Sequence, residues 1–333
     1  MVINNNMKQI ILTSIAVLLL AMPTMAKNND IFLFAYFNSD ETAGGQVWYA
    51  VSEDGVNFKP INDGKPIIAA DSISVSGAVR DPHILRAKNG WFYQVVTDLD
   101  ISKGKWTCRG FVMMRSKDLV NWEHHKVQFP IRYAGKDPAK ADAVWAPQTI
   151  YDPSVGKYMI YFSMHSPKDG PYPEDKVFYA YANDDFSDLE NDPQPLFDYD
   201  GPTIDTDIVQ DKDGVYHCFF NTWGGEFRGT ARRQMTFTDF HDKATWKLIP
   251  GRMQPTENYS EGSCCYPDGK AGWFMVYDCF RDHICQFCHS TDLVNWKWIQ
   301  DSQTQPNYSP KHGTVIIISK KEYKKIKKLL AIR

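Results

Sequence analysis

A seven-residue phrase, Ser-x-Asp-x-Val-Asn-aromatic, occurs three times in this chain of 333 residues and constrains the fold more than any other feature. The copies lie at 52–58, 116–122 and 290–296, so their starts are 64 and 174 residues apart. The longer interval equals three steps of about 58 residues, and weaker copies lie inside it at 183–186 and 238–246. Five copies of one unit predict an array of supersecondary units rather than one irregular domain.

Each unit is expected to contain short strands separated by turns. Runs rich in aromatic and β-branched residues lie at 91–96, 158–162 and 273–277, and Gly-containing turn sequences precede them. Four strands per unit and five units predict an all-β fold, a five-bladed β-propeller with four-stranded blades. We expect the ring to close in a shared blade, to which the two chain ends contribute strands at 31–37 and 312–318. A β-sandwich is the rival fold, but it would not predict phrases spaced by about sixty residues.

The N-terminus has the features of an export signal. Lys8 precedes an apolar run at 10–21, and small residues at 24–26 suit a signal peptidase. The apolar run is shorter than the ~20 residues that a membrane span requires, so a transmembrane anchor is the weaker interpretation. We therefore expect a signal peptide at 1–26 and a single catalytic propeller at 27–319. The expected location is periplasmic or secreted, with no membrane span after cleavage.

The overall charge argues against nucleic acid as a partner. The formal net charge is −3 and the isoelectric point is about 6.3, whereas a nucleic-acid-binding domain favours a basic face. The basic C-terminal stretch, 320–333, is interpreted as a solvated tail rather than a binding arm. Five of the seven cysteines crowd into 264–288, without the spacing of a zinc site. Buried small side chains are the favoured interpretation of these cysteines, with one disulfide left open.

Acidic residues stand where the innermost strand of three blades is expected to begin. They are Asp81 in Arg-Asp-Pro-His, Asp205 in Ile-Asp-Thr-Asp and Glu261 in Ser-Glu-Gly-Ser. The third blade opens instead with Trp-Ala-Pro-Gln at 145–148, which carries no acid. The innermost strands of a propeller surround the central channel, so these side chains are expected to converge. A single acid at a strand end is most simply a cap or a turn former, but three at equivalent places of a repeat predict a catalytic site.

The order of these motifs, which ends with His-Gly-Thr-Val at 312–315, resembles glycoside hydrolase family 43 over residues 32–319. The resemblance implies that Asp81 is the general base and Glu261 the general acid. It implies that Asp205 is a carboxylate that tunes the acid. It further implies that four residues bind substrate: Trp145, Gln148, Arg281 and His312.

The resemblance also bears on cofactors and on departures from the family. His312 matches an axial histidine that often lies near a calcium ion or a water cluster, so calcium at the axis is the one candidate metal and no cofactor is required. Arg281 matches an arginine that often steadies the tuning carboxylate. Gln148 stands where many members place an acid, and Ser263 replaces the usual proline after Glu-Gly. These two departures weaken the inference about the substrate.

Three carboxyls suit the hydrolysis of a glycosidic bond. An inverting enzyme needs a protonated acid beside the leaving oxygen and an ionised base ~6.5–9.5 Å away that activates water. A nearby anion raises the pKa of an acid, and Asp205 would do so for Glu261. We expect an exported, inverting, exo-acting and monomeric glycosidase whose partner is a pentose-containing plant carbohydrate. An α-L-arabinofuranosidase is favoured, and a β-xylosidase or an exo-β-galactanase remains open.

Two other functions remain open. A retaining fructan-type hydrolase also carries Arg-Asp-Pro, but its nucleophilic Asp would lie one blade earlier. The candidates Asp54, Asp63 and Asp71 lack the expected Trp-x-Asn-Asp-Pro context. A non-catalytic carbohydrate-binding propeller would be favoured by the loss of one of the three acids, and none is lost.

Overall fold

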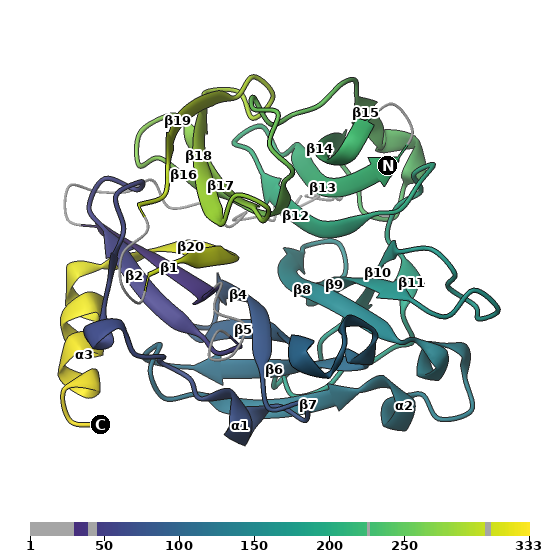
Figure 1. Ribbon diagram of the computed structural model, residues 1–333, viewed down its shortest axis with the longest axis horizontal. Helices are drawn as coiled ribbons and strands as arrows, with labels where there is room; N and C mark the ends of the chain where they lie inside the picture. Colours follow the sequence, from purple (N-terminus) through teal and green to yellow (C-terminus); the bar gives the residue numbers. More distant parts are fainter. Residues whose placement is uncertain (1–29, 39–44, 225–226, 304–307) are drawn as a thin grey trace, which may run out of the picture.

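The computed structural model describes residues 30–38, 45–224, 227–303 and 308–333. The expected signal peptide, 1–26, therefore lies outside the described residues. The described chain forms five four-stranded antiparallel sheets, and these are arranged around a common centre (Figure 1). The prediction of a five-bladed β-propeller with four-stranded blades is confirmed.

The blades are numbered in chain order, and the strands of each are given from the centre outward (Figure 1). Blade 1 contains β20 (Pro310–Ser319), β1 (Asp30–Asn38), β2 (Trp48–Ser52) and β3 (Lys59–Pro60). Blade 2 contains β4 (Val79–Arg86), β5 (Phe92–Asp98), β6 (Gly110–Ser116) and β7 (Glu123–Gln128). Blade 3 contains β8 (Ala143–Asp152), β9 (Lys157–His165), β10 (Lys176–Tyr181) and β11 (Gln194–Pro195). Blade 4 contains β12 (Ile204–Gln210), β13 (Tyr216–Gly224), β14 (Phe227–Phe237) and β15 (Lys247–Ile249), and blade 5 contains β16 (Glu261–Pro267), β17 (Trp273–Cys279), β18 (Ile284–Ser290) and β19 (Lys297–Asp301).

Short helices lie in the connections between strands. Two are single α-helical turns, α1 (Ala70–Ile73) and α2 (Phe129–Arg132). Five are 3₁₀ turns: η1 (Asn62–Gly64), η2 (Ile101–Lys103), η3 (Lys105–Thr107), η4 (Asp137–Lys140) and η5 (Lys243–Thr245). Of these, η2 and η3 lie in the connection from β5 to β6, which borders the site described below.

The repeated phrase forms the turn between the third and fourth strands of a blade. In blade 2, Oδ1 of Asp118 accepts hydrogen bonds from the backbone N–H groups of Val120 (3.0 Å) and Asn121 (2.8 Å). Such side-chain bonds replace backbone bonds in a tight turn, which explains the fixed spacing of the phrase. The aromatic residue that ends the phrase packs between blades, as Trp296 does against Phe219 of blade 4, with ring centroids 5.9 Å apart. The phrase therefore both turns the chain and joins neighbouring blades.

The two ends of the described chain meet in blade 1. β1 pairs with β20 from Asp30 opposite Ser319 to Tyr36 opposite Gly313, and its other edge pairs with β2. Residues 31–37 of β1 are all buried, so this strand lies inside the fold on both faces. The expected closure of the ring by strands from both ends is confirmed.

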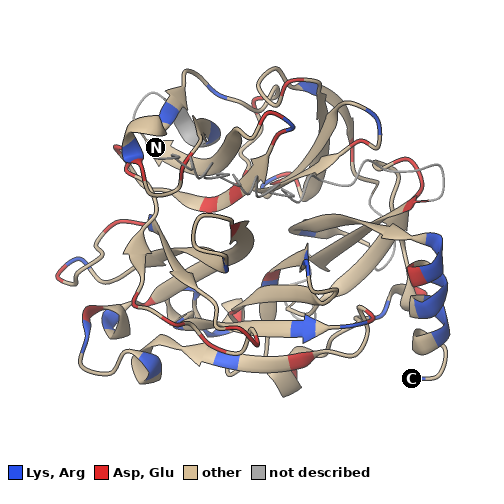
Figure 2. Cartoon of the chain, turned by 180° about the vertical axis from the view of Figure 1, so that it is seen from behind, with Lys and Arg blue, Asp and Glu red and all other residues tan. Residues whose placement is uncertain are grey.

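The basic C-terminal stretch is not a solvated tail, which corrects the sequence interpretation. It forms α3 (Lys320–Leu330), which begins with a capping box between Ser319 and Glu322. Ile326 is fully buried against blades 1 and 2, whereas the lysines of the helix face solvent (Figure 2). Arg86 of blade 2 also contacts Glu322 at 2.7 Å. The apolar side chains of α3 thus pack the helix against blades 1 and 2, although most of its residues are lysines.

All seven cysteines are described, buried and free, which agrees with their interpretation as small apolar side chains. Cys265, Cys279 and Cys288 pack in the core of blade 5. No disulfide forms among them. Within the described part of the chain, none of the helices has the length and apolar character that a bilayer crossing would require.

Candidate active site

All five innermost strands share one irregularity close to their first residue. The pairing of each with the next strand is interrupted by a register shift, as at a β-bulge. Four of these strands, β4, β8, β12 and β16, also share a backbone conformation at the bulge. The bulged residue has a left-handed backbone: Asp81 (φ 53°), Ala146 (φ 45°), Asp205 (φ 51°) and Gly262 (φ 53°). A bulge leaves one residue unpaired and re-aims its side chain. All four bulged residues line one cavity between the innermost strands.

The bulges show that the three predicted acids do not occupy equivalent places, which corrects the sequence expectation. Asp81 and Asp205 both occupy the bulge of their strand. Glu261 instead precedes the bulge of β16 and corresponds to Trp145 of blade 3. The offset of one residue is a matter of backbone register, which the spacing of motifs does not reveal.

Gly262 occupies the bulge of blade 5 because no larger residue fits. A Cβ atom at this position would lie 2.0 Å from Cγ of His312. The positive φ of Gly262 would add strain to any other side chain. Its backbone N–H donates a 2.8 Å hydrogen bond to Oδ2 of Asp205, so blade 5 orients the acid of blade 4.

Asp81 is an ionised carboxylate in an ion pair. Its Oδ1 lies 2.8 Å from Nε2 of His312, and its Oδ2 accepts a 2.5 Å hydrogen bond from the hydroxyl of Thr97. Burial alone would raise the pKa of Asp81, but the charges of His312 and Arg80 and these hydrogen bonds bring the pKa below its ordinary value. Burial likewise opposes the charge of His312, yet contacts with Asp81 and Asp278 raise the pKa of this imidazole well above its ordinary value. The site therefore holds an aspartate and an imidazolium side by side.

Glu261 lies opposite Asp278 in the pairing of β16 with β17, and Lys311 contacts both. Nζ of Lys311 is 3.0 Å from Oδ2 of Asp278 and 3.6 Å from Oε1 of Glu261. Burial raises the pKa of Glu261 most, and the charges of Asp278 and Asp205 raise it further, to about 7, against the opposing charge of Lys311. An acid with such a pKa holds its proton near neutral pH and can donate it. The sequence analysis missed Asp278 and Lys311, although Lys311 directly precedes the predicted His312.

The structure places Arg281 away from its expected partner. Its guanidinium lies 3.6 Å from the centre of the Tyr259 ring, and the residue is exposed. The cation beside Asp205 is Arg232, which is fully buried and donates to the backbone oxygen of Asp205 at 3.3 Å and to Oδ1 of Asn221 at 3.4 Å. Sequence reasoning missed Arg232. The available signal was a charged residue inside a strand. An arginine is fully buried only where it is paired, so Arg232 in a strand indicates a buried partner.

The residues around His312 do not fit the calcium site that the family resemblance suggests. Oxygen or nitrogen atoms of Glu261, Asp278 and His312 lie within 4.8 Å of one another, as ligands of an ion would. However, Nζ of Lys311 already contacts both carboxylates, and His312 is a protonated partner of Asp81. Calcium takes six to eight oxygen ligands, a set that this cluster lacks. The ammonium group of Lys311 occupies the place between Glu261 and Asp278 where a cation would neutralise their charge.

The cavity at the centre combines charged and neutral polar groups. It is lined by Asp81, Pro82, His83, Ala146, Gln148, Asp205, Gly262, His312 and Gly313. Nδ1 of His83 accepts a 3.2 Å hydrogen bond from the N–H of Thr149, and burial lowers the pKa of His83 to about 3, so this imidazole is neutral. The side-chain oxygen of Gln148 accepts from the Tyr161 hydroxyl at 2.9 Å, which fixes the amide at the cavity wall. Among the predicted substrate-binding residues, Gln148 and His312 thus line the cavity, whereas Trp145 packs beside it.

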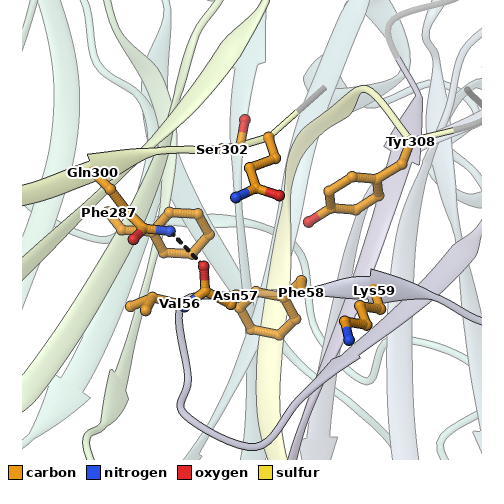
Figure 3. Close-up of a pocket in the computed structure, with 9 residues that line it drawn as sticks. Val56, Asn57, Phe58, Lys59, Phe287, Gln300, Ser302 and Tyr308 are labelled. Atoms are coloured by element: carbon orange, nitrogen blue, oxygen red, sulfur yellow. Dashed lines mark hydrogen bonds between the residues drawn. The ribbon is translucent and has the colours of Figure 1, made fainter. Parts of the chain in front are cut away.

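A second cavity lies at the junction of blades 1 and 5 (Figure 3). Its wall includes Asn57 and Phe58 of the first repeated phrase and Phe287 and Gln300 of blade 5. Gln300 donates a 3.1 Å hydrogen bond to Asn57 across the junction. Its described walls contain none of the predicted acids, and we assign it no catalytic role.

Two curated proteins match parts of the chain. Over 136 residues the chain is 29% identical to an α-L-arabinofuranosidase from Bifidobacterium longum, which covers 38% of this chain and 12% of that protein. It is 32% identical over 81 residues to a β-1,2-mannobiose phosphorylase from a Thermoanaerobacter species, which covers 24% of this chain and 25% of that protein. The chain therefore spans a quarter or less of the length of these two relatives.

Solved structures show the same fold at low identity. The GH43_1 enzyme from Xanthomonas citri complexed with xylose superposes with a TM-score of 0.53 at 17% identity, over 71% of this chain and 75% of that chain. An exo-β-1,3-galactanase from Clostridium thermocellum superposes with a TM-score of 0.51 at 16% identity, over 71% of this chain and 51% of that chain. The family described as "Probable glycosyl hydrolase domain", related to glycoside hydrolase family 43, matches residues 28–324. The match spans most of the chain, and the protein belongs to this family.

Proposed function

We propose that the protein is an inverting exo-glycosidase that removes terminal pentosyl units from plant carbohydrates, with α-L-arabinofuranosides as the favoured substrates. One observation carries the proposal: two carboxyls that both lie beside His312 have pKa values shifted in opposite directions. Asp81 is ionised beside an imidazolium, and Glu261 has a pKa of about 7. Two titratable groups whose surroundings separate their pKa values are suited to the roles of base and acid.

The proposed reaction is a single displacement in which both protons are accounted for. Asp81 takes a proton from a water molecule while the water oxygen forms a bond to the anomeric carbon. Glu261 gives its proton to the glycosidic oxygen as the bond from that oxygen to the anomeric carbon breaks. Burial raises the pKa of Asp205, while the Gly262 N–H and Arg232 oppose this rise, and in its ionised form the carboxylate would stabilise the developing positive charge of the sugar ring.

Exo action is proposed from the family resemblance and not from the size of the cavity, whose volume is about 10 Å³, room for a water molecule.

The choice of a pentose rests on similarity. One curated relative is an α-L-arabinofuranosidase, and one structural neighbour was solved with xylose. Another structural neighbour is an exo-β-1,3-galactanase, so galactosides belong in the same test. The expected signal peptide at 1–26 supports action in the periplasm or outside the cell.

The proposal is tested with aryl α-L-arabinofuranoside, aryl β-xyloside and aryl β-galactoside, together with the corresponding oligosaccharides. Proton NMR of the first product identifies the anomer, and inversion is expected. Retention of configuration would support the fructan-type alternative. Calorimetric binding of oligosaccharides without any hydrolysis would support a carbohydrate-binding propeller.

Two variants separate the roles of the carboxyls. Glu261→Gln should reduce kcat for natural linkages by about 10²–10⁴-fold and should partly spare an aryl substrate, because a good leaving group needs little protonation. Asp81→Asn should impair both kinds of substrate, and added azide should restore part of the activity. Near wild-type turnover by Asp81→Asn would show that the base has been assigned to the wrong residue.

A further inference from the structure

An exposed aromatic surface lies beside the cavity. Trp106 in η3 is 40% exposed, and its indole stacks on Trp145, with centroids 5.0 Å apart and an angle of 24° between the rings. The same indole lies 4.3 Å from the ring of His165. Trp145 and His165 come from the neighbouring strands β8 and β9, and Asp142 holds His165 through a 2.7 Å contact. Trp106 therefore packs on two fixed rings and stays partly exposed, with Nζ of Lys105 4.6 Å from the centre of its ring.

This surface adjoins the proposed active site. Trp145 directly precedes Ala146, which lines the cavity. The connection that carries Trp106 is tied to blade 3, because the N–H of Val144 donates a 2.9 Å hydrogen bond to the carbonyl of Cys108. A ligand that protrudes from the cavity toward blades 2 and 3 would thus meet Trp106.

Asp175 adds a buried hydrogen-bond acceptor near this surface. Asp175 is 5% exposed, and its Oδ1 atom has no hydrogen-bond partner among the described residues. Burial raises the pKa of Asp175 to about 6, and the charges of His165, Lys105 and Asp205 also act on it. Two of these groups, His165 and Lys105, contact Trp106, and the third, Asp205, lines the cavity. The Oδ1 atom of Asp175 can therefore accept a hydrogen bond from a ligand hydroxyl near Trp106.

We propose that Trp106 and Asp175 form a second sugar-binding subsite, which holds the unit on the leaving-group side of the scissile bond. This inference rests on the proposed function. Because Trp145 precedes Ala146 of the cavity wall and stacks on Trp106, an oligosaccharide that extends from the cavity over blades 2 and 3 crosses Trp106. An aromatic face packs against the C–H face of a sugar ring, and a carboxyl binds its hydroxyl groups. The other strongly exposed tryptophan of the described chain, Trp298, lies on β19, the outermost strand of blade 5.

The test compares Trp106→Ala with Trp298→Ala as the matched control. Both variants are assayed on an aryl α-L-arabinofuranoside, which has one sugar, and on arabinotriose and xylotriose. We expect Trp106→Ala to lower the ratio of kcat/KM for a trisaccharide to kcat/KM for the aryl glycoside by about 3- to 10-fold. Asp175→Asn should lower the same ratio by less. An unchanged ratio in Trp106→Ala, or an equal change in Trp298→Ala, would overturn the proposal.

A binding measurement separates this inference from the proposed function. Glu261→Gln and the double variant with Trp106→Ala are titrated with arabinotriose and xylotriose by calorimetry. Weaker binding by the double variant supports the subsite, even if the wild-type protein hydrolyses none of the glycosides and the proposed function fails. Equal affinities of the two proteins would refute the subsite. A loss that follows Tyr259→Ala instead would place the bound chain over blade 5 and would also refute it.

Discussion

Asp278, which the sequence analysis did not identify, should set the alkaline limit of catalysis. Its nearest carboxylate oxygen lies within 4.8 Å of Glu261. Two unit charges at that distance repel by about 0.9 kcal/mol in a water-like dielectric and by about 3.5 kcal/mol at an effective dielectric constant of about 20. One pKa unit corresponds to about 1.4 kcal/mol, so Asp278→Asn should lower the pKa of Glu261 by about 0.6 to 2.5 units. The lower half of this range is expected, because about a quarter of the Glu261 side chain is exposed.

The sign of the effect follows from the role of Glu261. The acid acts in its protonated form, so a lower pKa removes the proton at a lower pH. The alkaline limb of kcat/KM, measured from about pH 4 to about pH 9 on a natural linkage, should therefore move to lower pH in Asp278→Asn. Asp205→Asn should move it in the same direction by less, since Asp278 raises the pKa of Glu261 more than Asp205 does.

The matched control is Asp282→Asn in the same hairpin. Asp282 is exposed and accepts a hydrogen bond from Asn258, so its removal should leave the profile in place. Thermal melts establish that each variant is folded. A profile for Asp278→Asn that superimposes on that of the wild type, or a larger shift in Asp205→Asn, would refute the reasoning.

Three further perturbations test the structure. Lys311→Met should move the alkaline limb to higher pH, because Glu261 loses a neighbouring cation. It should also lower the free energy of unfolding by about 3–5 kcal/mol in chemical denaturation, because a buried carboxylate loses its cation. An equal loss of stability in Lys311→Arg would contradict this. Gly262→Ala should reduce kcat/KM by about 100-fold. The new Cβ would lie 2.0 Å from Cγ of His312 and would push this imidazole away from Asp81, the proposed base. Wild-type kinetics would disprove the clash. Deletion of 311–333 removes β20 and should abolish cooperative melting. Deletion of 320–333 removes only α3 and should lower Tm by several degrees. Identical melting curves of the two deletion variants would argue against closure of the ring by β20.

The fold could be predicted because its signal is local. In each full copy of the phrase the Asp side chain accepts hydrogen bonds from the backbone N–H groups two and three residues later. The residues that form the turn are therefore neighbours in the sequence and can be recognised there. The same locality accounts for Asp81 and Glu261, which stand in short motifs at strand starts. The acids were recognised, although their relative register was not.

The supporting charges could not be predicted in the same way. Arg232 reaches Asp205 from two strands away, and Asp278 meets Glu261 only through the pairing of β16 with β17. Lys311 arrives from the last strand of the chain. These contacts depend on strand register and on packing between blades, which short motifs do not encode. The helix α3 was missed for a different reason, because a single apolar stripe was hidden among lysines.

The pairing of β1 with β20 also determines when this protein can finish folding. Asp30 pairs with Ser319, so the first described strand waits for nearly the whole chain to be made. At about 5–20 residues per second, that wait lasts about 15–60 s, during which the apolar segment 31–37 lacks its β20 partner. Contacts so distant in sequence also slow folding once the chain is complete. A nascent chain that exposes this apolar segment for so long is expected to need protection by chaperones until β20 has been made.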